Sequence, residues 1–69
     1  MNKFIIEFEE SVGLDTPGAA RLLGIGRPTY THYRSAMRPL PDYHRKHMEV
    51  LMRVSQKLLR ELIEESIDG

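Results

Sequence analysis

Residues 16–38 read TPGAARLLGIGRPTYTHYRSAMR, and this pattern predicts two short helices, Pro17–Leu23 and Arg27–Met37. Thr16 can cap the first helix, because its hydroxyl can accept a hydrogen bond from a free amide of the first turn. Pro17 suits the first helical position, where its missing N–H costs nothing. The residue types at this point therefore define where the first helix begins.

The turn between the two helices is short, Gly24-Ile25-Gly26. Gly24 can adopt the left-handed backbone conformation that ends a helix, and Ile25 then places an apolar side chain under the corner. Two helices that cross steeply over such a turn form a helix-turn-helix. At 3.6 residues per turn, the inner faces of the two helices consist of Ala19, Ala20 and Leu23, and of Tyr30, Tyr33 and Met37.

The opposite face of the second helix carries polar and basic side chains that cannot build a core. If this face meets DNA, its N-terminal end projects into the major groove, where Arg27 can pair with both O6 and N7 of guanine. The residues expected to contact bases are Arg27, Pro28, Thr31, His32 and Ser35, and those expected to contact phosphates are Thr16, Thr29, Arg34, Arg38, His44 and Arg45. The alternative is that these are ordinary solvated helix residues.

The segment ARLLGIGRPTYTHYRSAMRPLP, residues 20–41, resembles the helix-turn-helix of small phage Cro and repressor proteins, the lambda-repressor-like or XRE class of transcriptional regulators. The shared features are a small residue at Ala20, a glycine at Gly24, apolar residues at Ile25, Tyr30 and Tyr33, and the sequence Arg38-Pro39-Leu40-Pro41. The resemblance covers about residues 14–54. It implies an all-α bundle of four to five helices. In this bundle a helix N-terminal to these two packs across the helix-turn-helix, and Leu14 is buried where they join.

The same resemblance implies a sequence-specific regulator that binds double-stranded DNA, acting as a dimeric repressor on a palindromic operator. Phage regulators, small autoregulators of accessory operons such as anti-CRISPR-associated proteins, and antitoxins share this plan. Two-fold symmetry would set the reading helices about 34 Å apart. The competing hypothesis is a protein-interaction module, such as an antitoxin or a partner-binding helical adaptor.

The charge is segregated along the chain, although ten basic and ten acidic residues give a formal net charge of zero. Residues 1–15 carry −3, residues 16–46 carry +5 and residues 47–69 carry −2. A basic segment that coincides with the predicted helix-turn-helix is the electrostatic pattern of a DNA-binding face.

Sixty-nine residues allow one small domain, residues 1–69, whose core is marginal on its own. The chain has no cysteine, which excludes disulfides and thiolate metal sites and is what a reducing cytoplasm permits. Dimerisation is the remaining way to supplement the core. We expect a cytoplasmic protein with no membrane span and no small-molecule effector.

The N-terminal segment, residues 2–12, is predicted to be a helix that ends at Gly13. One face carries Phe4, Ile5, Phe8 and Val12, and we expect Glu7, Glu9 and Glu10 to be in solvent.

From Asp42 to Ile67 no glycine or proline intervenes, and one helix of that length would span about 39 Å. Either the segment breaks near Val54-Ser55-Gln56 into a fourth and a fifth helix, or it runs on and packs against another chain. We expect residues 56–67 to form a dimerisation helix, with an intramolecular fifth helix as the alternative. The residues expected at the dimer interface are Leu51, Leu58, Leu59, Leu62 and Ile63.

Other chemistries are less well supported by the residues. His44 and His47 form an H-x-x-H pair, but a zinc site needs three or four ligands, so we expect no metal and no cofactor. Tyr30 and Tyr33 could stack on single-stranded bases, yet their spacing places them on the side of the alanines, which favours core packing. Without a cysteine nucleophile, or a glycine-rich phosphate loop after a strand, we expect no enzyme.

Overall fold

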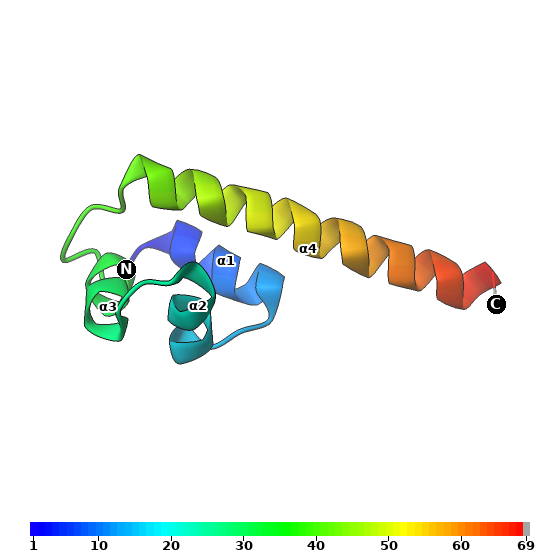
Figure 1. Cartoon of the computed structure of the whole chain (residues 1–69), viewed down its shortest axis with the longest axis horizontal. Helices are drawn as coiled ribbons and strands as arrows, with labels where there is room; N and C mark the ends of the chain where they lie inside the picture. Colours follow the sequence, from blue (N-terminus) through cyan, green and yellow to red (C-terminus); the bar gives the residue numbers. More distant parts are fainter. Residues whose placement is uncertain (69) are drawn as a thin grey trace.

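The computed structural model describes the backbone of residues 1–68 and the side chains of residues 1–64. The described chain is entirely helical outside its turns and contains α1 (Lys3–Val12), α2 (Thr16–Leu23), α3 (Arg27–Arg34) and α4 (Asp42–Asp68). The first three helices form a compact cluster under one half of α4, and the other half of α4 extends past them (Figure 1). The prediction of a small all-α bundle is confirmed, with four helices rather than five in the described residues.

The starts of α1 and α2 are fixed by side-chain caps. The Oδ1 atom of Asn2 accepts a hydrogen bond from the amide of Ile5 over 3.2 Å. Asp15, and not Thr16, caps α2, because its Oδ1 atom accepts from the amide of Gly18 over 2.9 Å. The predicted capping role of Thr16 is therefore wrong by one residue, and Thr16 is instead the first residue of α2.

The turn between α2 and α3 follows the prediction. Gly24 has φ of 70°, in the left-handed region, and ends α2. The amide of Ile25 donates to the carbonyl of Ala20 over 3.0 Å, which satisfies one of the last carbonyl groups of the helix. Ile25 is half-buried against the core, under the corner as expected.

The helix α3 ends at Arg34, three residues earlier than predicted. Ala36 adopts φ of 66°, and the amides of Met37 and Arg38 both donate to the carbonyl of His32, over 2.9 and 3.2 Å. This reversal turns the chain away from the helix axis. Met37 is consequently 74% exposed, so the prediction that it lies on the inner face is wrong.

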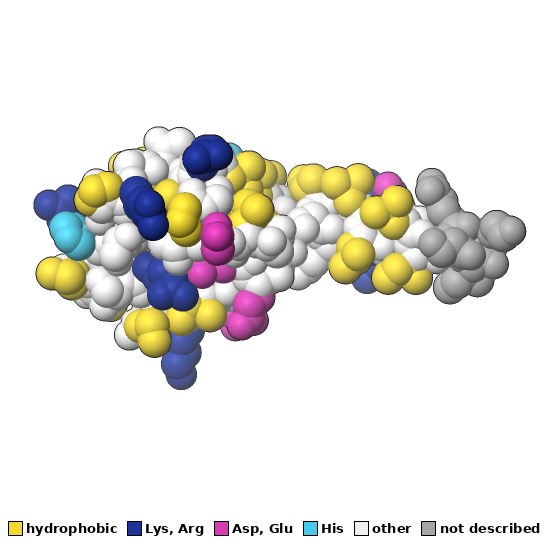
Figure 2. Space-filling model, turned by 90° about the horizontal axis from the view of Figure 1, so that it is seen from below, with side chains coloured by type: hydrophobic (Ala, Val, Ile, Leu, Met, Phe, Trp, Pro, Cys, Tyr) yellow, Lys and Arg dark blue, Asp and Glu magenta, His cyan; other side chains and the backbone are white. Residues whose placement is uncertain are grey.

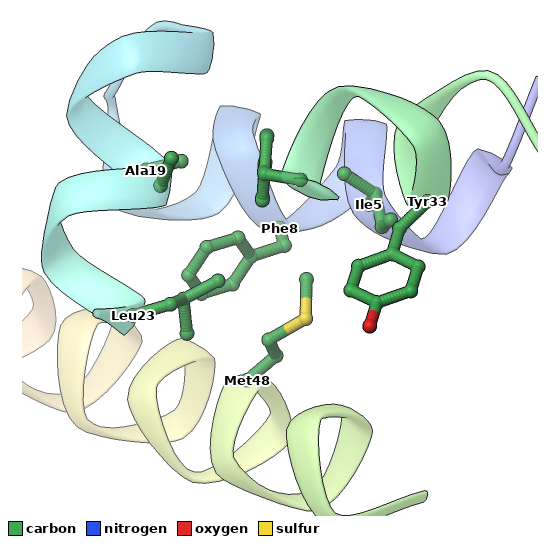
Figure 3. Packing of buried hydrophobic residues seen from close by; sticks show 8 residues of the cluster. Ile5, Phe8, Ala19, Leu23, Tyr33 and Met48 are labelled. Carbon is green, nitrogen blue, oxygen red and sulfur yellow. The ribbon is translucent and has the colours of Figure 1, made fainter. Parts of the chain in front are cut away.

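The core lies where α1, α2 and α3 meet the first half of α4. Figure 3 shows Met48 reaching from α4 toward the side chains contributed by the other three helices. Buried apolar residues of the core are Ile5, Phe8, Ala19, Ala20, Leu23, Tyr30, Tyr33 and Met48. The predicted inner faces of the three short helices are thus confirmed, Met37 excepted.

Leu14 does not fill this core and is 37% exposed, contrary to the prediction. Gly13, with φ of 69°, reverses the chain, and the amide of Leu14 donates back to the carbonyl of Glu9 over 3.1 Å. The Leu14 side chain then lies near Gly18 at the start of α2, at the surface of the bundle.

The helix α4 is continuous over 27 residues, so the predicted alternative of a break near Val54-Ser55-Gln56 is wrong. Its first half packs on the core through Met48, with Leu51 and Met52 half-buried beside it. Leu51 therefore belongs to the core of one chain, which corrects its assignment to the dimer interface. The Ser55 hydroxyl donates to the carbonyl of Ser11 over 3.0 Å, and the remainder of α4 extends beyond α1.

Among the described residues, no helix is both long enough and apolar enough to span a bilayer.

Candidate nucleic-acid interface

The two faces of α3 have opposite environments. Tyr30 and Tyr33 are buried against the core, with 1% and 9% of their surface exposed. Arg27, Thr31 and Ser35, one helical turn apart from each other, are exposed on the other side. This is the orientation that the spacing of the two tyrosines predicted.

The remaining base-contact candidates lie beside this exposed row. Pro28 is exposed in the first turn of α3, where a proline leaves no hydrogen bond unmade. His32 is half-buried on the flank of the helix. The structure therefore brings all five candidates onto one helix and its immediate end, with four of them exposed.

The hydroxyl groups on this face have defined orientations. The Thr31 hydroxyl donates to the carbonyl of Arg27 over 2.9 Å, and the Ser35 hydroxyl donates to the carbonyl of His32 over 3.3 Å. Because each hydroxyl hydrogen is engaged within the helix, each oxygen is left with acceptor lone pairs. Thr31 and Ser35 can therefore accept from the amino groups of adenine or cytosine, and the Thr31 methyl can contact a thymine methyl.

The N-terminus of α3 is suited to a negative charge. Gly26 is the N-cap and supplies no side-chain hydrogen bond to the first turn. The partial positive charge of a helix N-terminus favours an anion at this position. Thr29, a predicted phosphate contact, is half-buried in this first turn, next to the exposed Arg27.

The other predicted phosphate contacts differ in how available they are. Arg38 is exposed after the end of α3. The Arg45 guanidinium lies 5.2 Å from the centre of the Phe4 ring, and its Nε atom lies 3.5 Å from Oε1 of Glu49. The centroid of the His44 ring lies 6.0 Å from that of the Tyr33 ring and 4.3 Å from that of the Tyr43 ring. Arg45 and His44 therefore also have packing roles at the start of α4.

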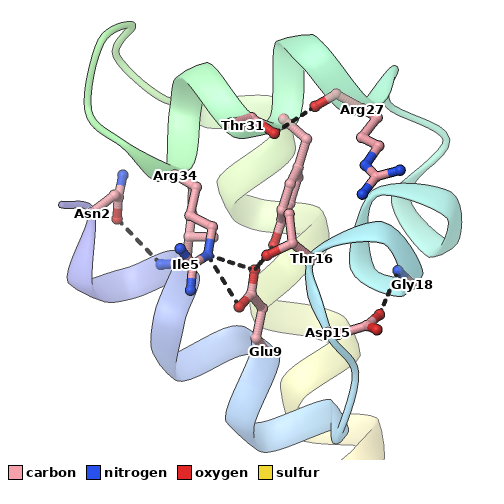
Figure 4. A network of polar contacts seen from close by, with 10 residues as sticks. Asn2, Ile5, Glu9, Asp15, Thr16, Gly18, Arg27, Thr31 and Arg34 are labelled. Atoms are coloured by element: carbon pink, nitrogen blue, oxygen red, sulfur yellow. Dashed lines mark hydrogen bonds and ion pairs between the residues drawn. The ribbon is translucent and has the colours of Figure 1, made fainter.

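Arg34 and Thr16 belong to a polar cluster around Glu9, which Figure 4 shows between α1, α2 and α3. The Nε atom of Arg34 donates to both carboxylate oxygens of Glu9, over 3.2 and 3.0 Å. The Tyr30 hydroxyl donates to Oε2 over 2.7 Å, and the Thr16 hydroxyl donates to the same oxygen over 3.4 Å. One carboxylate thus links α1 to both α2 and α3.

The expectation that Glu9 is in solvent is wrong, because only 8% of its surface is exposed. Burial and the hydrogen bond to the Glu9 carboxylate raise the pKa of the Tyr30 phenol well above its usual 10.0. The sequence does contain a signal for this cluster. Glu9 follows the buried Ile5 by four residues, and Arg34 follows the buried Tyr30 by four, so each shares a helix face with a core residue.

A further basic residue was not among the predicted contacts. Arg21 is exposed in the last turn of α2, the helix that precedes the turn. Together with Arg27 and Arg38, it gives the two short helices and the segment after them three exposed arginines. In Figure 2, dark blue side chains are spread over the part of the molecule that contains α1, α2 and α3.

Among the described residues, no group of three or more histidine and acidic side chains is placed to hold a metal ion. No protein-family model matches the chain, and comparison with curated proteins and with solved structures finds no match.

Proposed function

We propose that this chain is a sequence-specific regulator that binds double-stranded DNA and reads the major groove with the exposed face of α3. The observation that carries the proposal is the opposite environment of the two faces of α3. Tyr30 and Tyr33 are buried, whereas Arg27, Thr31 and Ser35 are exposed. An exposed helix with such side chains, held by a short turn, is the element that enters a major groove.

The dimensions of α3 suit this role. An α-helix with its side chains is about 10–12 Å across, which matches the width of the major groove, about 12 Å. Arg27 lies at the N-terminal end, which is the end that approaches base edges in helix-turn-helix proteins. There its guanidinium can donate to both O6 and N7 of a guanine, a contact that discriminates by about 1–3 kcal/mol.

Phosphate contacts would fix the position of α3 without reading sequence. Arg21 and Arg38 are exposed on either side of α3 in the chain, and the uncapped first turn of α3 favours a phosphate oxygen. Arg34 can contribute through its terminal NH₂ groups, because Glu9 engages its Nε atom. The Glu9 carboxylate would then orient this arginine from below.

A protein-interaction module is the second candidate function, and one observation favours it. The second half of α4 exposes Leu58, Leu59 and Ile63, each with more than half of its surface accessible. An exposed apolar row on a helix is a common protein-binding surface. An antitoxin would use both this surface and a DNA-binding face.

Selection of bound fragments from a random pool of DNA duplexes tests the proposal. We expect enrichment of a short site with two-fold symmetry, which would identify a homodimer on a palindromic operator. Affinity for this site should fall steeply with salt, with a slope of about −0.9 for each phosphate neutralised. A folded protein that enriches no sequence would contradict the proposal and leave the protein-interaction module as the function.

A further inference from the structure

We propose that the second half of α4 pairs antiparallel with the same segment of a second copy of this chain. The segment concerned is residues 56–68, which we call the α4 extension. It begins after the hydrogen bond between Ser55 and Ser11 and lies beyond α1 (Figure 1). This proposal concerns a contact between two proteins, and it does not depend on DNA binding.

The apolar face of the α4 extension continues the face that packs on the core. Leu51 and Ser55 contact the cluster formed by α1, α2 and α3, which we call the body of the chain. Leu58 and Leu62 follow them at alternating steps of four and three residues, so all four residues lie on one side of α4. Leu59 and Ile63 widen this row. Figure 2 shows the apolar side chains gathered on the extension.

The side chains on this face of α4 become exposed at the point where α4 extends past the body of the chain. Met48 is fully buried, whereas Leu58, Leu59, Leu62 and Ile63 are between 53% and 61% exposed. Removal of such apolar side chains from water is favourable. A partner of matching length and pattern would therefore stabilise the extension.

The charges on α4 indicate which orientation such a partner takes. Arg53, Lys57 and Arg60 precede Glu61 and Glu64, so the helix is basic and then acidic along its length. Two copies in parallel would place like charges side by side, which is unfavourable. Two antiparallel copies place Lys57 of each beside Glu64 of the other, with Arg60 at the centre of the pair. The charge pattern of one α4 extension is thus complementary to that of a second extension that runs in the opposite direction, and this identifies a second copy of the chain as the partner.

The length of the extension fits this arrangement. Thirteen residues, 56–68, give a segment about 20 Å long, so an antiparallel partner extension of the same length can reach the end of α1 in the first copy. The register that matches the apolar rows places Leu58 opposite Leu62 of the second copy. Beside Leu58, a groove between the end of α1 and α4, lined by Val12, Gly13, Ser55 and Leu58 among others, can receive the part of the second helix around its Leu62.

The register also has a consequence for DNA binding, and this consequence rests on the proposed function. The Tyr33 ring packs on the His44 ring, so α3 lies near the start of α4. Residue 44 of one copy lies about 48 Å along the paired helices from residue 44 of the other, at 1.5 Å per residue. We therefore expect operator half-sites whose centres are more than one helical turn apart, wider than the 34 Å of adjacent major grooves.

Analytical ultracentrifugation without DNA tests whether the pairing exists. We expect the wild-type chain to be a dimer at high concentration and Leu58→Asp to be a monomer with unchanged helix content. Val50→Asp is the matched control, because Val50 is 54% exposed on α4 and lies on the other side of the helix, beside the body. This variant should remain dimeric. A wild-type chain that is monomeric throughout, or a dimer lost equally in both variants, would overturn the proposal.

A distance between two spin labels tests the orientation and does not depend on the folding of a charged variant. The chain has no cysteine, so Lys46→Cys gives one exposed labelling site on each copy. In the proposed register the two labels are about 28 residues apart along the axis, or about 42 Å. A parallel pair, with helix axes 8–10 Å apart, would give less than about 25 Å and would refute the antiparallel arrangement. Loss of sequence-specific DNA binding with these distances intact would contradict only the proposed function.

Discussion

The hydroxyl of Tyr30 donates a hydrogen bond to Oε2 of Glu9 over 2.7 Å and so connects the centre of α3 to α1. The same carboxylate accepts two hydrogen bonds from Arg34, one turn further along α3. Two points on one helix are thus held by a single acidic side chain. This arrangement fixes the rotation of α3 about its axis and, with it, the direction in which Arg27 and Thr31 face.

Glu9→Gln should destabilise the fold. The substitution removes the charge that Arg34 and Tyr30 bind, and hydrogen bonds to a charged group contribute about 1.5–3 kcal/mol. We expect the free energy of unfolding to fall by about 2–3 kcal/mol, which for a domain of this size lowers the Tm by about 10–20 °C. Chemical denaturation measures the first quantity and calorimetry the second.

Glu10→Gln is the matched control for that substitution. Glu10 is the next residue of α1 and is exposed, so its replacement should change the free energy of unfolding by less than about 0.5 kcal/mol. Equal stability of the two variants would show that the Glu9 cluster does not hold α3.

Tyr30 should make the fold sensitive to alkaline pH. In the unfolded chain its phenol ionises near the usual pKa of 10.0, whereas in the folded chain burial and Glu9 hold the pKa higher. The folded state therefore retains a proton that the unfolded state loses, and this contribution to stability is complete below pH 10 and decreases above it by about 1.4 kcal/mol per pH unit.

The comparison with Tyr30→Phe isolates this contribution. Phenylalanine fills the same space but cannot ionise, so the stability difference between the two proteins should shift in favour of Tyr30→Phe as the pH rises from 9 to 11. Denaturation curves at both pH values measure this shift. A difference that does not change with pH would mean that Tyr30 ionises equally easily in the folded chain.

Ala36→Gly should stabilise the protein. Ala36 has φ of 66°, a conformation that costs a residue with a Cβ about 1–2 kcal/mol and a glycine almost nothing. After the greater chain entropy of glycine in the unfolded state is subtracted, we expect a gain of about 0.5–1 kcal/mol. Ser35→Gly is the control, because Ser35 has an ordinary φ of −81° and its replacement should lower stability. The opposite order of the two variants would contradict the left-handed conformation at residue 36.

The sequence was sufficient to predict the parts of the fold that depend on local chemistry. Gly24 and the prolines near the starts of α2 and α3 place the turn, and the spacing of Tyr30 and Tyr33 correctly orients α3. The end of α3 could not be predicted in the same way. It depends on Ala36 in a left-handed conformation, and alanine carries no signal for that conformation.

The polar cluster was missed for a different reason. A glutamate on an amphipathic helix is normally in solvent, and the burial of Glu9 depends on Tyr30 and Arg34, which lie more than twenty residues further along the chain. The candidate contacts on α3 could be predicted because they share one helix. The packing of His44 and Arg45 depends on Tyr33 and Phe4, which belong to other helices, and the sequence alone does not place these side chains together.

The most direct measurement of whether the outer face of α3 reads DNA is the affinity of Arg27→Ala for the selected duplex and for a scrambled duplex at one salt concentration. We predict that the preference for the selected site falls by about 1–3 kcal/mol, roughly 5- to 150-fold, while folding is unchanged. Arg53→Ala, which removes an exposed arginine from α4, should keep the full preference. Undiminished preference in Arg27→Ala, or an equal loss in both variants, would contradict the assignment of α3 as the reading helix.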